Sequence, residues 1–175
     1  MRNIIFIGGI HGVGKTTLCK KVSEELNIAH YSCSELIRKR VALDSVKKNV
    51  SDIPKNQNIL LEAVEEFCSQ EAELILDGHF CLKDKMGVVT NVPIDTFREL
   101  QIGSIIVLKS NPQMITKNLM SRDSIIYGLE DIRKFQEQEI VYSREVANFL
   151  GIDYIVVDVS VEWNYFIEHV RNLGK

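Results

Sequence analysis

Eight residues near the N-terminus combine three glycines, a lysine and a threonine at a fixed spacing. They match the pattern G-x-x-x-x-G-K-[ST] in full, and their sequence is Gly9-Ile10-His11-Gly12-Val13-Gly14-Lys15-Thr16. Glycines let the backbone turn tightly, so that several N–H groups can point at one anion. We therefore expect a phosphate-binding loop that holds a nucleoside triphosphate, ATP, through the following residues: Gly9, His11, Gly12, Val13, Gly14, Lys15, Thr16 and Thr17.

Two side chains of this loop have the chemistry to act on phosphates. Lys15 is predicted to reach the β- and γ-phosphates as a catalytic cation from a solvent-filled cleft, and the Thr16 hydroxyl is predicted to ligate Mg²⁺. The flanking residues agree with this interpretation. Residues 3–7 are apolar and β-branched, as in a buried parallel strand. Residues 16–26 carry apolar side chains at a spacing of four, which predicts a helix whose N-terminus adds positive potential behind the loop.

A second candidate for metal binding follows another apolar run. Residues 73–78 predict a strand that ends in Asp77 and a glycine. This pattern is typical of a Walker B strand, whose catalytic carboxylate holds Mg²⁺ opposite Thr16, although an ordinary strand can also end at an acidic turn. His79, two residues further on, is a candidate for contacting phosphates, a water or an acceptor hydroxyl, the alternative being a loop side chain without a role.

Arginines are the expected partners of a phosphoryl group in transfer, because negative charge spreads over that group. Arg38 follows the second predicted strand and is expected to face an acceptor. Arg122 and Arg133 are candidates to close on the transferred group as catalytic residues, whereas Arg144 is expected to be solvated. For each of them the alternative is a solvated surface arginine.

The remaining sequence alternates between strand and helix patterns. The predicted elements are strands at 29–31, 104–108 and 154–157, helices at 34–40, about 60–70, 95–100, from Pro112 after the cap Asn111, 130–150 and 161–173, an exposed excursion at 41–58, and a loop at 79–93. In the helix at 130–150 an apolar stripe from Ile132 to Phe149 is interrupted by Glu139, and Gly151 stops the helix. Five apolar strands separated by helices predict an α/β fold, a parallel sheet with helices on both faces. Ligands of such sheets bind at the carboxyl ends of the strands, where the phosphate loop and Asp77 both fall.

Composition limits the classes of partner. The chain has 175 residues, as expected for a single domain, and a net charge of −3, which gives no general attraction to nucleic acid or to an anionic membrane. The strand pattern begins at Asn3, so we expect no signal peptide before it, and no apolar run is long enough to span a bilayer. Four cysteines form no C-x-x-C pair and have no histidine at zinc-site spacing. We therefore expect a reduced, cytoplasmic protein.

With these motifs identified, the chain resembles the adenylate kinase group of P-loop kinases, most closely the compact archaeal-type branch and its small relatives. The resemblance extends over nearly the whole length. It is carried by the phosphate loop, in which His11 replaces a proline common in the family, by the segment Ser32-Cys33-Ser34-Glu35-Leu36-Ile37-Arg38, and by the turn Asp77-Gly78-His79. It implies a P-loop NTPase fold in which an acceptor-binding excursion lies at about 32–70 and a short lid at about 122–133. It also implies that Ser34, Arg38 and His79 contact the acceptor.

The sequence thus predicts phosphoryl transfer from Mg·ATP to a small nucleotide acceptor, with AMP as the first choice. Two other functions remain open. One is a slow regulatory ATPase that acts with a protein or RNA partner, because few arginines occur in the predicted lid and His79 is a candidate for positioning an attacking water. The other is a kinase of a different hydroxyl acceptor, which would need a general base. The sequence does not specify the oligomeric state.

Overall fold

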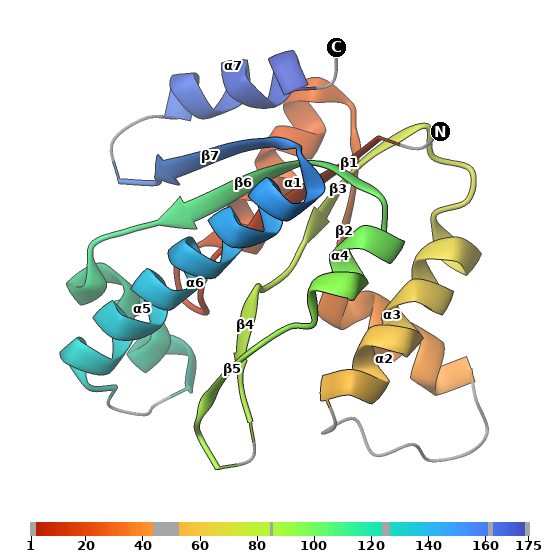
Figure 1. Ribbon diagram of the computed structural model, residues 1–175. Helices are drawn as coiled ribbons and strands as arrows, with labels where there is room; N and C mark the ends of the chain where they lie inside the picture. Colours follow the sequence, from red (N-terminus) through yellow and green to blue (C-terminus); the bar gives the residue numbers. More distant parts are fainter. Residues whose placement is uncertain (1–2, 44–52, 85, 124–126, 161–162, 174–175) are drawn as a thin grey trace.

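A twisted parallel sheet forms the centre of the protein (Figure 1). The computed structural model describes residues 3–43, 53–84, 86–123, 127–160 and 163–173. The sheet has five strands in the order β2-β3-β1-β6-β7. Their bounds are β1 Asn3–Gly8, β2 Ala29–Ser32, β3 Glu73–Asp77, β6 Ile102–Lys109 and β7 Asp153–Asp158. All neighbouring strands pair in parallel, which confirms the predicted fold class.

The register of the sheet brings the chemically active segments to one edge. Asp77 at the end of β3 lies between Ser32 of β2 and Ile7 of β1. The phosphate loop starts immediately after β1, and the backbone N–H of Gly78 donates to the carbonyl of Ile7 at 3.1 Å. Since parallel strands end on the same side, the loop, the carboxylate and the following histidine turn must all lie at this carboxyl edge.

Helices cover both faces of the sheet (Figure 1). Helix α1, Lys15–Leu26, packs on β1, β2 and β3 behind the sheet, whereas α6, Leu129–Leu150, crosses in front of it and packs on β6 and β7. The other helices are α2 Cys33–Leu43, α3 Ile53–Phe67, α4 Ile94–Glu99, α5 Pro112–Asp123 and α7 Trp163–Leu173. Strands β1, β3 and β6 are buried on both faces, which explains why their sequences are continuously apolar.

Local signals set several helix ends as the sequence predicted. The Asn111 side chain accepts a hydrogen bond from the backbone N–H of Gln113 at 2.9 Å, and α5 then begins at Pro112. Gly151 ends α6 in a left-handed conformation, with φ of 66°, and its N–H donates to the carbonyl of Ala147. These are short-range interactions, so sequence alone suffices to locate them.

The acceptor-side excursion is more helical than predicted. The sequence predicts an exposed excursion at 41–58, outside the predicted helices, but α2 continues to Leu43 and α3 already begins at Ile53. Residues 44–52 lie outside the described part of the chain. Pro54 is the second residue of α3, and proline is well tolerated in the first turn of a helix, where no N–H has an intrahelical partner. Gln57, within the expected excursion, is buried.

Two further expectations were wrong. The loop predicted at 79–93 contains an antiparallel hairpin of β4, Cys81–Lys83, and β5, Val89–Asn91. Strands of three residues are too short to show a period in the sequence. Phe149 was placed in the apolar stripe of α6 but is 56% exposed, because it lies in the last turn of a helix whose packing on the sheet is carried by Val146 and Ala147.

No helix within the described residues has the length and apolar character needed to cross a membrane.

Candidate functional site

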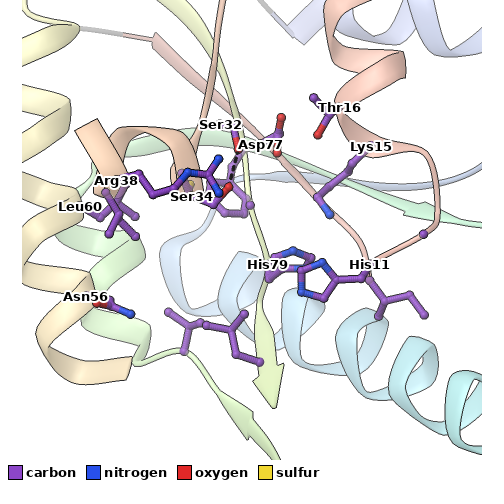
Figure 2. Close-up of a pocket in the computed structure, with 18 of the residues that line it drawn as sticks. His11, Lys15, Thr16, Ser32, Ser34, Arg38, Asn56, Leu60, Asp77 and His79 are labelled. Carbon is purple, nitrogen blue, oxygen red and sulfur yellow. Dashed lines mark hydrogen bonds between the residues drawn. The ribbon is translucent and has the colours of Figure 1, made fainter. Parts of the chain in front are cut away.

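A cavity of about 960 Å³ opens at the carboxyl edge of the sheet (Figure 2). Its lining runs from the phosphate loop, past the ends of β2 and β3, to α3 and α5. The site residues predicted from the sequence that line it are His11, Gly12, Gly14, Lys15, Thr16, Thr17, Ser34, Arg38, Asp77, His79 and Arg122. Segments from four parts of the chain therefore share one space.

The backbone of the phosphate loop has the geometry that its glycines predict. Gly14 has a φ of 99° and forms the N-cap of α1, and no side chain of the described residues caps this helix terminus. Gly12 has a φ of 83°, and a Cβ placed there would lie 2.7 Å from the Leu119 side chain. A side chain would thus be strained at both positions and would also clash at Gly12. The uncapped N–H groups of the first turn of α1 form an anion-binding terminus.

Lys15 is more enclosed than predicted. Its side chain lines the cavity but is only 7% exposed, and its Nζ donates to the Gly9 carbonyl at 2.7 Å. Burial lowers the pKa of Lys15, and the nearby carboxylates of Glu139 and Asp77 oppose that shift. Lys15 thus lines the cleft into which it was predicted to project, but its Nζ is bonded to the Gly9 carbonyl and does not extend freely into solvent.

Asp77 is buried at the end of β3 and is fixed by a neighbour that sequence reasoning missed. Its Oδ2 lies 2.6 Å from Nε2 of His30 on β2. Cys19 of α1 lies beside this pair. Its Sγ, a ring nitrogen of His30 and a carboxylate oxygen of Asp77 all lie within 4.8 Å of one another. The sequence contained no zinc-type spacing, and the cluster arises only because the fold brings three elements together. Its histidine and carboxylate are already joined by the hydrogen bond.

The Mg²⁺ expected from the sequence can be tested against these side chains. Thr16 and Asp77 line the same cavity, next to Lys15 (Figure 2). Hydroxyl and carboxylate oxygens are the hard ligands that Mg²⁺ prefers, and Asp77 keeps a second carboxylate oxygen beyond the one that faces His30. The donor set therefore fits a magnesium ion held between the phosphate loop and β3.

Two histidines lie side by side, one in the phosphate loop and one in the turn after β3 (Figure 2). The rings of His11 and His79 have centroids 4.1 Å apart and are tilted by 46°. Burial, and then the positive charge of Lys15, lower the pKa of His79 well below its usual value, so this ring is neutral near pH 7. Its Nδ1 is buried and finds no hydrogen-bond partner among the described residues.

The other half of the cavity has a mixed surface suited to a second small molecule. Arg38 and Ser34 of α2 line it, and the Ser34 hydroxyl lies 3.1 Å from that of Ser32. Beyond them the wall is mainly apolar, with two amide side chains on α3. These further lining residues are Ile37, Asn56, Gln57, Leu60, Val92 and Phe97.

Some predicted site residues lie elsewhere. Among the described residues, Arg133 does not line the cavity; it is exposed on α6 and pairs with Glu130 at 2.7 Å. Arg144 packs its guanidinium over the ring of Tyr154 at 5.7 Å. Residues 124–126 of the predicted lid lie outside the described residues, so Arg133 keeps its predicted role only as a hypothesis. Gly9 and Val13 belong to the loop but are not among the residues that line the cavity.

The sequence also missed Glu139, which it presented as an interruption of an apolar stripe. This side chain is 1% exposed and accepts hydrogen bonds from three backbone N–H groups, those of Gly9, Phe80 and Cys81. One signal was available in the sequence. A carboxylate on the buried face of a helix requires several donors or a cation, so it marks a polar connection whose partner the sequence does not name.

Comparisons with known proteins agree with this geometry. A family profile described as an AAA domain matches residues 8–133. An adenylate kinase of Thermoplasma acidophilum is 28% identical over 161 residues, which cover 86% of this chain and 85% of that protein. A putative adenylate kinase of Thermococcus onnurineus is 30% identical over 174 residues, or 98% of this chain and 76% of that protein. The crystal structure of an uncharacterized protein from Eubacterium ventriosum shares the fold, with a TM-score of 0.51, 16% identity and coverage of 98% and 97% of the two chains.

Proposed function

Because this chain belongs to the AAA domain family and to the adenylate kinase group of P-loop proteins, we propose that it is a nucleotide kinase for nucleoside monophosphates. It transfers the γ-phosphoryl group of Mg·ATP to the monophosphate, and AMP is the acceptor proposed first. One observation carries the proposal. The phosphate loop and Arg38 line opposite parts of one continuous cavity, which offers space for a donor and an acceptor that meet end to end.

The residues that line the cavity have different roles in this reaction. The loop amides and Lys15 bind the β- and γ-phosphates, and Arg38 with Ser34 orients the acceptor. Arg122, on α5 at the cavity wall, approaches the group in transfer. An ionised phosphate oxygen of the acceptor is already a nucleophile, so no general base is required. Catalysis then consists of positioning and of stabilising the negative charge of the transition state.

Thr16 and Asp77 are the residues that would hold Mg²⁺, and the ion would neutralise charge between the β- and γ-phosphates. The hydrogen bond from His30 fixes the orientation of the Asp77 carboxylate for this purpose.

A coupled assay of ADP formation tests the proposal. ATP and Mg²⁺ are supplied with each nucleoside monophosphate in turn, and we expect turnover that depends on the acceptor and is fastest with AMP. The control is Lys15→Ala, for which we expect at least a hundredfold loss, the scale typical of removing one stabilising charge from a transition state. Its fold should survive, because the substitution removes a buried cation. Absence of acceptor-dependent turnover with every monophosphate would refute the kinase assignment.

His79 favours one alternative, a slow regulatory ATPase. The residue lines the same cavity as Lys15, and its buried Nδ1 lacks a partner among the described residues, so a small rotation of the ring would let it bind a water beside the phosphates. The same assay without acceptor separates the two functions. A regulatory ATPase would hydrolyse ATP alone and would lose that activity in His79→Ala, whereas the kinase would hydrolyse little ATP until an acceptor is added.

A further inference from the structure

Glu139 joins two segments that form the wall of the cavity but does not itself line it. Its Oε1 accepts hydrogen bonds from the backbone N–H groups of Gly9 and Phe80, both at 3.0 Å. Its Oε2 accepts one from the N–H of Cys81 at 2.7 Å. Gly9 begins the phosphate loop, and the other two residues directly follow His79. One carboxylate on α6 thus holds both the first residue of the phosphate loop and the two residues that follow His79.

The charge state of this side chain follows from its partners. Burial raises the pKa of Glu139, and the hydrogen bonds from Phe80, Cys81 and Gly9, together with the charge of Lys15, oppose that rise. A carboxylate offers only acceptors, so it can satisfy all three N–H groups at once. A neutral acid would place a proton on one oxygen and leave fewer acceptors for three donors.

Gly9 connects Glu139 to the lysine of the loop. The N–H of Gly9 donates to Glu139, while the carbonyl of the same residue accepts from Lys15 Nζ at 2.7 Å. Lys15 Nζ has three N–H donors and is the group that would turn from this carbonyl toward a bound phosphate. When it does so, the hydrogen bond to Glu139 still holds Gly9 in place, and the start of the loop keeps the orientation that the remaining amides need.

We propose that Glu139 is a positioning residue for triphosphate binding, which fixes Gly9 and the backbone after His79 in the arrangement that the phosphates require. It also ties α6, the helix that follows the predicted lid segment, to the phosphate loop. This inference rests on the proposed function only in so far as the loop binds a nucleoside triphosphate. It assigns Glu139 no contact with the nucleotide.

The chain supplies a matched control on the same helix. Gln136 lies one turn before Glu139, is 9% exposed, and bonds both to the backbone N–H of Ser110 at 2.9 Å and to its carbonyl at 3.0 Å. It therefore also connects α6 to the carboxyl edge of the sheet through buried hydrogen bonds. It holds the end of β6 rather than the phosphate loop. Gln136→Ala measures what the loss of such a connection does to stability alone.

The experiment compares Glu139→Gln, Glu139→Ala and Gln136→Ala with the wild type by calorimetry of Mg·ATP binding, thermal unfolding and steady-state kinetics. Gln keeps one acceptor oxygen for Gly9 and Phe80 but turns an NH₂ group toward the N–H of Cys81. We expect Mg·ATP affinity to fall about tenfold in Glu139→Gln and further in Glu139→Ala. KM for ATP should rise by a similar factor. Gln136→Ala should lower the unfolding temperature but leave the affinity within about twofold of the wild type.

Glu139 variants that unfold at a lower temperature but bind Mg·ATP as the wild type does would overturn the proposal, because the role would then be structural only. A measurement on the wild type covers the case in which no variant folds. Amide hydrogen exchange of Gly9, Phe80 and Cys81 should be slow, and fast exchange at Gly9 would overturn the proposal. A wild type that binds Mg·ATP but shows no acceptor-dependent turnover would refute the kinase assignment and leave this inference standing.

Discussion

At the scale of single residues, the polar side chains of the site are buried, and burial requires each of them to have a hydrogen-bond partner. Lys15, Asp77 and Glu139 are 7%, 4% and 1% exposed, and each is bonded to a specific partner inside the protein. Unpaired groups of this kind would destabilise the fold by several kcal/mol. The hydrogen bonds of the site therefore both stabilise the protein and set the geometry in which phosphates are received.

The cysteines provide a prediction at this scale. None of the four described cysteines forms a disulfide, and burial raises the pKa of Cys81 to about 12 and also raises those of Cys19 and Cys33. Since the thiolate is the reactive form, its fraction at pH 8 falls by about a thousandfold relative to an exposed thiol. We expect a disulfide reagent such as dithiobis-nitrobenzoate to label the native protein very slowly at pH 8.

Unfolding in guanidinium provides the control, because all four thiols should then react within minutes. Cys33 is the most accessible candidate, since it lines the cavity. Any labelling there should slow further when Mg·ATP is present. Rapid reaction of the native protein would show that the thiols are less enclosed than the structure indicates.

The site residues that the sequence predicts and that line the cavity belong to contiguous patterns. Lys15, Thr16 and Asp77 stand next to the strands that position them, so local order was sufficient to place them at this edge of the sheet. His30 and Glu139 were missed because their partners are far away in the chain. Glu139 lies 130 residues from Gly9, and only the complete fold brings the carboxylate to its donors.

At the scale of elements, helix α5 forms one wall of the cavity and is fixed at its start by a side-chain cap. The Asn111 side chain accepts from the N–H of Gln113 and is itself exposed, so its removal affects capping but not core packing. Asn111→Ala should reduce the free energy of unfolding by about 1 kcal/mol. For a chain of this length that lowers the unfolding temperature by about 2–4 °C.

Asn111→Asp is the matched control, because aspartate caps a helix as well as asparagine does. Calorimetric scans of the three proteins under identical conditions give the comparison. An unchanged midpoint in Asn111→Ala, or an equal drop in Asn111→Asp, would show that the side chain does not stabilise α5 by capping.

Elements were predictable to the extent that they carry a long apolar period or a strong terminal signal. The five central strands and α1, α5 and α6 meet that condition. The start of α3 does not, because Pro54 indicates a loop in sequence but fits the first helical turn in the structure. The short hairpin of β4 and β5 is held partly by a backbone hydrogen bond from Val92 to Phe80, which no local pattern encodes.

At the scale of the whole molecule, the cavity is bounded by separate structural units. Helices α2 and α3 pack on each other and provide the wall proposed to bind the acceptor, whereas α5 and the phosphate loop provide the other wall. Asn118 of α5 donates to the carbonyl of Gly12 at 2.9 Å, which joins that helix to the loop. A ligand that spans the cavity contacts both units at once and should stabilise their arrangement more than a ligand of either half.

A compound that joins two adenosines through a chain of phosphates tests this arrangement in the intact protein. Its binding to the folded state stabilises by about 2.7 kcal/mol at a concentration of 100 times its Kd. For a chain of this size that raises the unfolding temperature by about 5–10 °C. We expect a larger shift than with the same concentration of ATP or of AMP, since one molecule would use both halves of the cavity. Lys15→Ala should lose most of the shift because the triphosphate half would lack its cation. An equal shift with ATP alone would mean that the acceptor half does not receive a nucleotide, and the proposed acceptor would then be wrong.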